Sequence, residues 1–135
     1  MFCAIFFRAI FFEGGTLVTL ITRIFAALTA AEFFYIFFLE TIATTSEKTA
    51  KVFGMDVSEL KRPSVTVLFK NQGVYNALIG VLILVAVFAF SSVTALIFLL
   101  LTIVAVALYG SVTSNPKILL MQGGIAMITL ITCLF

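Results

Sequence analysis

A chain of 135 residues of which 63% are hydrophobic and 10% charged is not a soluble domain, where charged residues make up about a quarter of the total. A net charge of +2 is too small to indicate binding to nucleic acid. There is no histidine, and the two cysteines, Cys3 and Cys133, stand at opposite ends of the chain. We therefore expect neither a metal site nor a cofactor.

The apolar residues occur in long runs, which predict membrane-spanning helices of about 20 residues each. Residues 1–16 form a short apolar extension interrupted by Arg8. A four-span membrane domain, 17–135, follows, with spans at about 17–39, 72–90, 93–113 and 118–135. The predicted fold class is all-α and integral to the membrane, an antiparallel four-helix transmembrane bundle with a short N-terminal extension.

The first predicted span carries one cation and a series of alanines. Arg23 lies near its start and is expected to extend toward the near interface. The pairs Ala26/Ala30 and Ala27/Ala31 have the small-xxx-small spacing that lets another helix approach closely.

One long connection, 41–69, joins the first and second spans. Asp56 followed three residues later by Glu59 is typical of a capping box that opens a short helix, which Pro63 would end. Ser64 is then the expected cap of a helix that continues directly into the second span.

The basic residues predict the orientation in the cell membrane. They are concentrated in the first and third connections, whereas the second, Ser91-Ser92, has none. By the positive-inside rule, 41–69 is cytoplasmic and both termini of this multi-pass protein are extracytoplasmic. The residues that carry this prediction are Lys48, Lys51, Lys61, Arg62, Lys70 and Lys117.

Polar side chains of all four spans fall in the cytoplasmic half of the predicted bundle and on shared helix faces, counting 1.5 Å and 100° per residue. Hydrocarbon contains no water, so each polar group needs a partner within the protein. We predict that these side chains converge on a ligand-binding cluster made of Glu32, Tyr35, Glu40, Asn71, Gln72, Tyr75, Asn76, Tyr109, Thr113 and Gln122.

Two interpretations of this cluster stay open. Intramembrane amides often join helices, so the cluster could be purely structural. A carboxyl group as deep as that of Glu32 instead favours a pocket or half-channel. Asn76 is expected to contact other spans under both interpretations, and Glu40 is a candidate ion-pair partner for Lys70.

Several short motifs resemble a known family of small bacterial four-span membrane proteins, catalogued as domain of unknown function 1304. The resemblance implies the fold and the membrane location, and it implies no established activity. Phe33 departs from the family pattern, in which a histidine usually follows the first glutamate. The motifs are Ala31-Glu32, Tyr35-Ile36, Leu39-Glu40, Phe53-Gly54, Asn71 to Asn76, Tyr109-Gly110 with Thr113, and Gln122-Gly123.

Three classes of function fit these features. The leading hypothesis is a non-enzymatic protein that binds or transports a small polar or amphipathic molecule through the cluster, and it leaves open assembly into a homo-oligomer. One alternative is a small membrane enzyme on a lipid-like substrate, with Glu32 as general acid or base and Tyr75 or Tyr109 as donor. The other is a structural accessory subunit of a membrane complex. No nucleophile–base pair or phosphate-binding loop is visible, which disfavours the enzyme.

Overall fold

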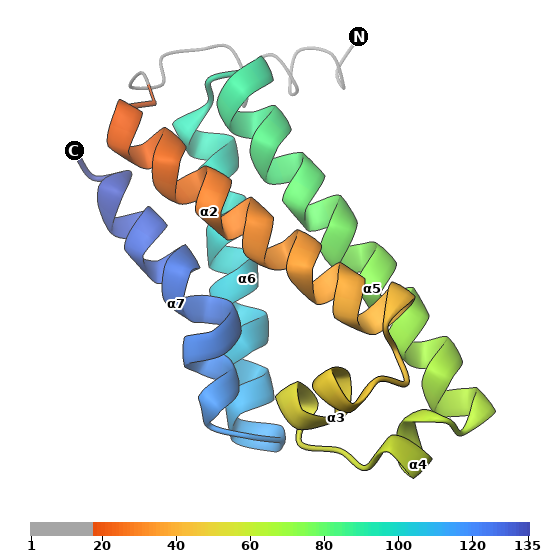
Figure 1. Cartoon of the computed structure of the whole chain (residues 1–135). Coiled ribbons are helices and arrows are strands. Elements are labelled where there is room, and N and C mark those ends of the chain that lie inside the picture. The colour runs from red at the N-terminus through yellow and green to blue at the C-terminus, as the bar shows by residue number, and fades with distance from the viewer. Residues whose placement is uncertain (1–17) are drawn as a thin grey trace, which may run out of the picture. The chain divides into compact units, whose positions relative to one another are not determined.

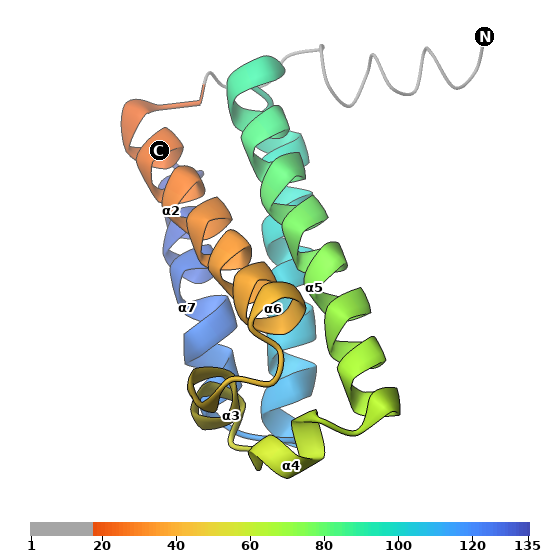
Figure 2. The same ribbon diagram turned by 45° about the vertical axis from the view of Figure 1, so that its right-hand side comes forward.

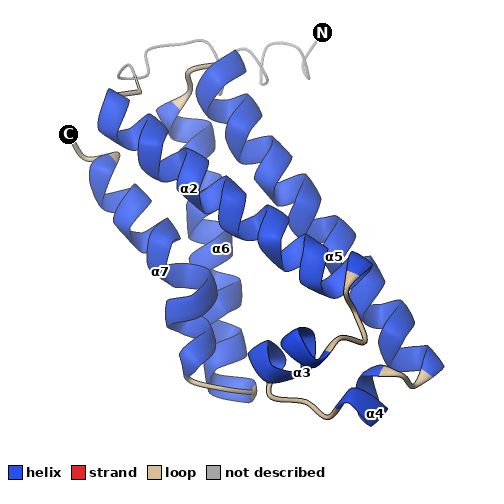
Figure 3. Ribbon diagram, in the orientation of Figure 1, coloured by secondary structure: helices blue, strands red, loops and turns tan. Residues whose placement is uncertain are grey.

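The computed structural model describes residues 18–135, in which the regular structure is helical and no strand occurs (Figure 3). The predicted extension 1–16 and Cys3 lie outside the described residues. Among the described residues, three helical segments are long and apolar enough to cross a membrane: Leu20–Ile42, Pro63–Ala89 and Val93–Thr113. The all-helical class is confirmed.

The fourth apolar helix is shorter than the others. Helix α7, Lys117–Thr132, has 16 residues, whereas a span needs about 20. The prediction of a fourth span over 118–135 therefore stays a prediction.

The chain divides into two compact units. The described residues up to Ala30 and the segment Val81–Phe135 make up the first, here called the hairpin unit. Residues Ala31–Gly80 make up the second, here called the loop unit. Helices α2, Leu20–Phe37, and α5, Pro63–Leu84, each contribute residues to both.

The hairpin unit is built on α6, Val93–Thr113, and α7, which lie side by side as an antiparallel pair (Figures 1 and 2). Leu100, Ala107 and Ala126 are completely buried. A Cβ atom added at Gly123 would lie 3.2 Å from the Cβ atom of Ala107, so the absence of a side chain there allows the two helices to approach closely.

Threonine hydroxyl groups connect the first part of α2 to α7. Thr22 Oγ1 donates to the carbonyl oxygen of Thr132 over 3.0 Å, and Thr29 Oγ1 lies 2.9 Å from Thr129 Oγ1. Ala26, between the two threonines, is completely buried. Small residues thus bring the helices close enough for their hydroxyl groups to bond, as is usual between helices in lipid.

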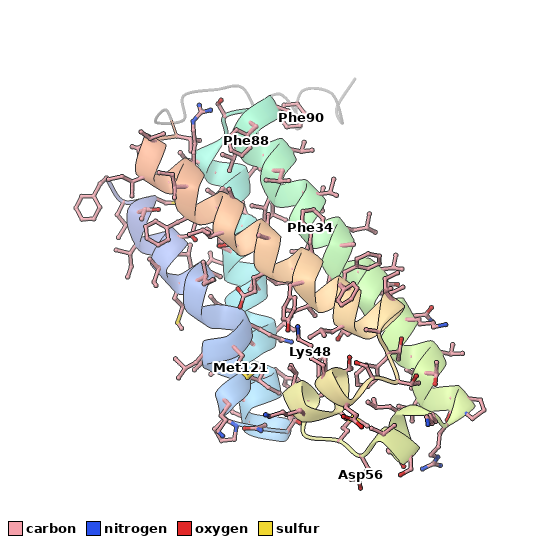
Figure 4. The ribbon with its side chains drawn as sticks, in the orientation of Figure 1. Phe34, Lys48, Asp56, Phe88, Phe90 and Met121 are labelled. Carbon is pink, nitrogen blue, oxygen red and sulfur yellow. The ribbon has the colours of Figure 1, made fainter. Side chains whose placement is uncertain are left out.

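The guanidinium group of Arg23, near the beginning of α2, makes three contacts within the hairpin unit. It donates to the carbonyl oxygen of Val18 over 3.2 Å and to Ser91 Oγ over 3.3 Å. It also lies 5.9 Å from the ring centre of Phe88, which belongs to a π-helix, η2, Val85–Ala89 (Figure 4). These contacts connect the beginning of α2 to the turn before α6.

In the loop unit, α2 continues into a second π-helix, η1, Phe38–Ile42, followed by α3, Glu47–Phe53, and α4, Val57–Leu60. The predicted capping box is wrong: Asp56 occupies the N-cap position and points outward, but makes no side-chain capping bond (Figure 4). Glu59 instead accepts a bond from Arg62 Nη1 over 2.9 Å.

The predicted cap of the following helix is also wrong. Helix α5 begins at Pro63, so Ser64 lies inside its first turn. Proline is favoured at the first helical position because the N–H it lacks would have no partner there. The expectation that this helix continues into the second span is confirmed, since Pro63–Ala89 is one long apolar segment.

Candidate functional site

A buried hydrogen bond joins the first and second predicted spans within the loop unit. Asn76 Nδ2 donates to Glu40 Oε2 over 2.6 Å. Glu40 is 4% exposed and Asn76 is 6% exposed. The expectation that Asn76 contacts another span is confirmed. In the described part of the chain Glu40 forms no ion pair with Lys70, and its carboxyl group is bound to the amide of Asn76 instead.

The π-helix η1 presents two adjacent residues to α5. Its wide turn is closed by a bond from Ala43 N to Phe38 O, 2.9 Å. Thr41, next to Glu40, donates from Oγ1 to the carbonyl oxygen of Lys70 over 3.2 Å. Glu40 and Thr41 therefore both make contacts with the same helix.

Gly73 makes this close crossing sterically possible. A Cβ atom at position 73 would overlap Thr41 Oγ1 and lie 3.1 Å from the Cβ atom of Glu40. Gly73 and Asn76 are both buried, as is Gly80 one turn further along α5. The buried stripe of α5 in this unit thus consists of two glycines with the asparagine between them.

Threonines complete the hydrogen bonding at the end of the first span. A helix end leaves carbonyl groups without partners, and three of them lie around Glu40. Thr44 Oγ1 donates to Glu40 O over 2.6 Å. Thr49 Oγ1, from α3, is 2.7 Å from Ala43 O and 3.2 Å from Leu39 O. Sequence reasoning missed Thr41, Thr44 and Thr49, although a threonine-rich stretch directly after Glu40 is visible.

Glu32 has a different environment. It lies twelve residues after Leu20 and ten before Ile42, near the middle of the first candidate span. Its Oε2 atom is buried and has no hydrogen-bond partner within residues 18–135. Leaving a buried polar atom unpaired costs about 1–3 kcal/mol, and more for a charged group. This oxygen therefore lacks the partner that a buried polar atom normally has.

The other predicted residues of the loop unit are exposed. The ammonium group of Lys48 lies over the ring of Tyr35, with its Nζ atom 5.0 Å from the ring centre. Asn71 and Gln72 are exposed on α5, and Tyr75 is 66% exposed. These side chains do not join the Glu40–Asn76 pair.

Three predicted site residues belong to the hairpin unit. Tyr109 is 72% exposed on α6. Thr113, also exposed, donates from Oγ1 to the carbonyl oxygen of Tyr109 over 2.8 Å, a bond within its own helix. Gln122 is half-buried on α7.

Residues 18–135 are all-helical, with three segments long and apolar enough to cross a membrane and a buried glutamate–asparagine hydrogen bond between the first two. The chain belongs to the family described as "Protein of unknown function (DUF1304)", which it matches over residues 27–134. The resemblance drawn from the motifs is thus confirmed.

A relative described as "Uncharacterized protein YpaA", from Lactococcus lactis subsp. lactis (strain IL1403), is 52% identical over 118 residues. The similarity covers 87% of this chain and 99% of the relative. No solved structure matches the chain.

Proposed function

We propose that this protein is a multi-pass protein of the cell membrane that binds or transports a small polar or amphipathic molecule, with Glu32 as the residue that meets it. The observation that carries the proposal is the buried, unpaired Oε2 atom of Glu32 near the middle of a candidate span. Acidic groups at such a depth are costly in lipid and usually serve a binding or transport site.

The chemistry of Glu32 defines the complementary group on the ligand. An unpaired carboxyl oxygen accepts hydrogen bonds, so a donor, such as an ammonium, hydroxyl or amide group, suits it. Ammonium is the strongest candidate because a charge-assisted bond is about twice as strong as a neutral one.

Glu40 has a supporting role in this proposal. Its side chain is bound to Asn76, and Thr44 binds its backbone carbonyl, so both its side chain and its backbone are held in place. Such a rigid crossing between α2 and α5 holds the segment that carries Glu32.

The arrangement we propose around this site is an antiparallel bundle of four spans, with α7 as the fourth and both termini extracytoplasmic. Support comes from the apolar character of α7 and from the basic residues of the loop unit. A helix of 16 residues can be accommodated by local thinning of the bilayer or by flanking side chains.

One observation favours the structural alternative. The Glu40–Asn76 bond satisfies both partners without a ligand, as expected for residues that only hold two spans together. An accessory subunit would need this bond but would have no use for the unpaired oxygen of Glu32.

A thermal-shift titration of the purified full chain in detergent tests the proposal. Methylammonium and choline serve as cationic probes, and the same concentrations of sodium chloride as the reference. We expect stabilisation of the parent and of Glu47→Gln, a matched variant of an exposed acid, and none of Glu32→Gln. Equal shifts in all three proteins would contradict a site at Glu32.

A further inference from the structure

Three exposed lysines of the loop unit lie where the first two spans end. The hydroxyl of Thr49 bonds the carbonyl groups of Leu39 and Ala43, so α3 packs against the last turn of the first span. Lys48, the preceding residue, extends back along that span to the ring of Tyr35. Tyr35 is seven residues before Ile42, which corresponds to about 10 Å along a helix.

Lys70 lies at a comparable level on α5. The segment Pro63–Ala89 has 27 residues, or about 40 Å of helix, against about 30 Å of hydrocarbon. Residues 74–89 contain no charge, so the end that extends beyond the hydrocarbon is the one that carries Lys70. The bond from Thr41 to the carbonyl oxygen of Lys70 independently places that residue beside the end of the first span.

These ammonium groups have no anionic partner in the described part of the chain. The ion pair found in the loop unit joins Arg62 to Glu59 and involves none of the three lysines. Lys48, Lys51 and Lys70 are all exposed, and Lys51 lies one turn after Lys48 on α3. Tyrosine and lysine are each favoured at the hydrocarbon boundary, where the apolar part of the side chain stays in lipid and its polar end reaches water.

From this placement we propose that Lys48, Lys51 and Lys70 form a docking surface for the phosphate groups of anionic phospholipids. Charge complementarity supplies the attraction, and the ends of the spans hold the lysines at headgroup depth. Each lysine near an anionic membrane surface increases the binding affinity about fivefold. This surface is independent of the ligand proposed for Glu32.

Lipid-dependent stability measures this interaction. The full chain, purified in a neutral detergent, is titrated with phosphatidylglycerol or with phosphatidylcholine, and its melting temperature is followed. We expect phosphatidylglycerol to raise the melting temperature well above the value in phosphatidylcholine. For the double variant Lys48→Gln/Lys70→Gln, the concentration of phosphatidylglycerol that gives half of the rise in melting temperature should be at least tenfold higher than for the parent.

The matched control is Lys61→Gln/Arg62→Gln, which removes the same charge from exposed positions nine and eight residues before Lys70. It should behave as the parent does. Equal loss in both double variants, or equal stabilisation by the two lipids, would overturn the proposal. A comparable shift with inorganic phosphate alone would also overturn it, because it would indicate a site for a soluble anion. If the glutamine variant does not fold, Lys48→Arg/Lys70→Arg must retain the phosphatidylglycerol effect.

Discussion

Asn76 and Glu40 are separated by 36 residues in the chain, and their side chains form a buried hydrogen bond of 2.6 Å. The bond connects η1, at the end of the first candidate span, to α5 in the second. Buried amide–carboxyl bonds are costly to break because each partner is then left without water or a substitute.

The first prediction is that Asn76→Leu destabilises the protein by about 1–3 kcal/mol, because it leaves the carboxyl group of Glu40 unpaired. Asn71→Leu provides the control, since it replaces an exposed amide on the same helix. Melting curves in detergent compare the two variants with the parent. Equal melting temperatures for all three proteins would mean that the Glu40–Asn76 bond contributes nothing to stability.

The second prediction concerns the crossing at Gly73. Gly73→Ala should lower the melting temperature, because the new methyl group overlaps Thr41 Oγ1 and must push α5 away from η1. Gly124→Ala is the control: it makes the same chemical change as Gly73→Ala, but its added methyl group would have no neighbour within 4 Å. It should be neutral or slightly stabilising, as alanine is the better helix former.

Thr41→Ala tests the cause of this effect. It removes the hydroxyl group that the new methyl would meet, so Gly73→Ala should cost less in a Thr41→Ala background. The same loss in both backgrounds would place the strain of Gly73→Ala elsewhere.

A third prediction follows from the buried hydroxyl pair of the hairpin unit. Thr29 and Thr129 each also lie within bonding distance of a carbonyl group of their own helix, Phe25 O and Ile125 O. Each hydroxyl has one proton, so one threonine must donate to the other while its partner donates to its own carbonyl.

A double-mutant cycle with Thr29→Val and Thr129→Val should therefore show coupling of about 0.5–1.5 kcal/mol. Thr102→Val is the control, because that exposed hydroxyl bonds only within α6, to Phe98 O. Additive losses for Thr29→Val and Thr129→Val would show that the two hydroxyls do not interact.

Orientation is the subject of the fourth prediction. In a background without Cys3 and Cys133, the variants Ser58→Cys and Thr94→Cys place single thiols at exposed positions, one before the second candidate span and one at the start of the third. An impermeant maleimide applied to intact cells should label position 94 and leave position 58 unlabelled until the cells are permeabilised. Labelling at 58 alone would reverse the proposed topology.

Hydrophobic runs predict a helix well where the apolar run and the helix begin and end at the same residues. The span expected at 93–113 is the helix Val93–Thr113. Ser92 fixes the start of this helix by accepting a hydrogen bond from Ala95 N. The sequence also predicts a helix that is capped by Ser64 and continues into the second span, and α5 begins at Pro63. Proline is favoured at the first helical position, so the helix starts at Pro63 and not after a serine cap.

The site was predicted only in part. The Asn76 contact followed from the cost of a polar group in lipid. The π-helix η1 did not, because a one-residue widening of a turn leaves no periodic pattern in five residues. Thr49 contacts Leu39 and Ala43 because the chain folds back and packs α3 against η1. The spacing of residues in the sequence does not predict this contact.

Glu32 provides the most direct test of the proposed function. Native mass spectrometry of the full chain, released from detergent, compares the parent with Glu32→Gln, Glu32→Ala and the exposed control Glu47→Gln. We predict that the parent and Glu47→Gln retain a small non-lipid molecule, that Glu32→Gln remains folded but loses it, and that Glu32→Ala loses it too. The same retained molecule in Glu32→Gln as in the parent would contradict a binding site at Glu32.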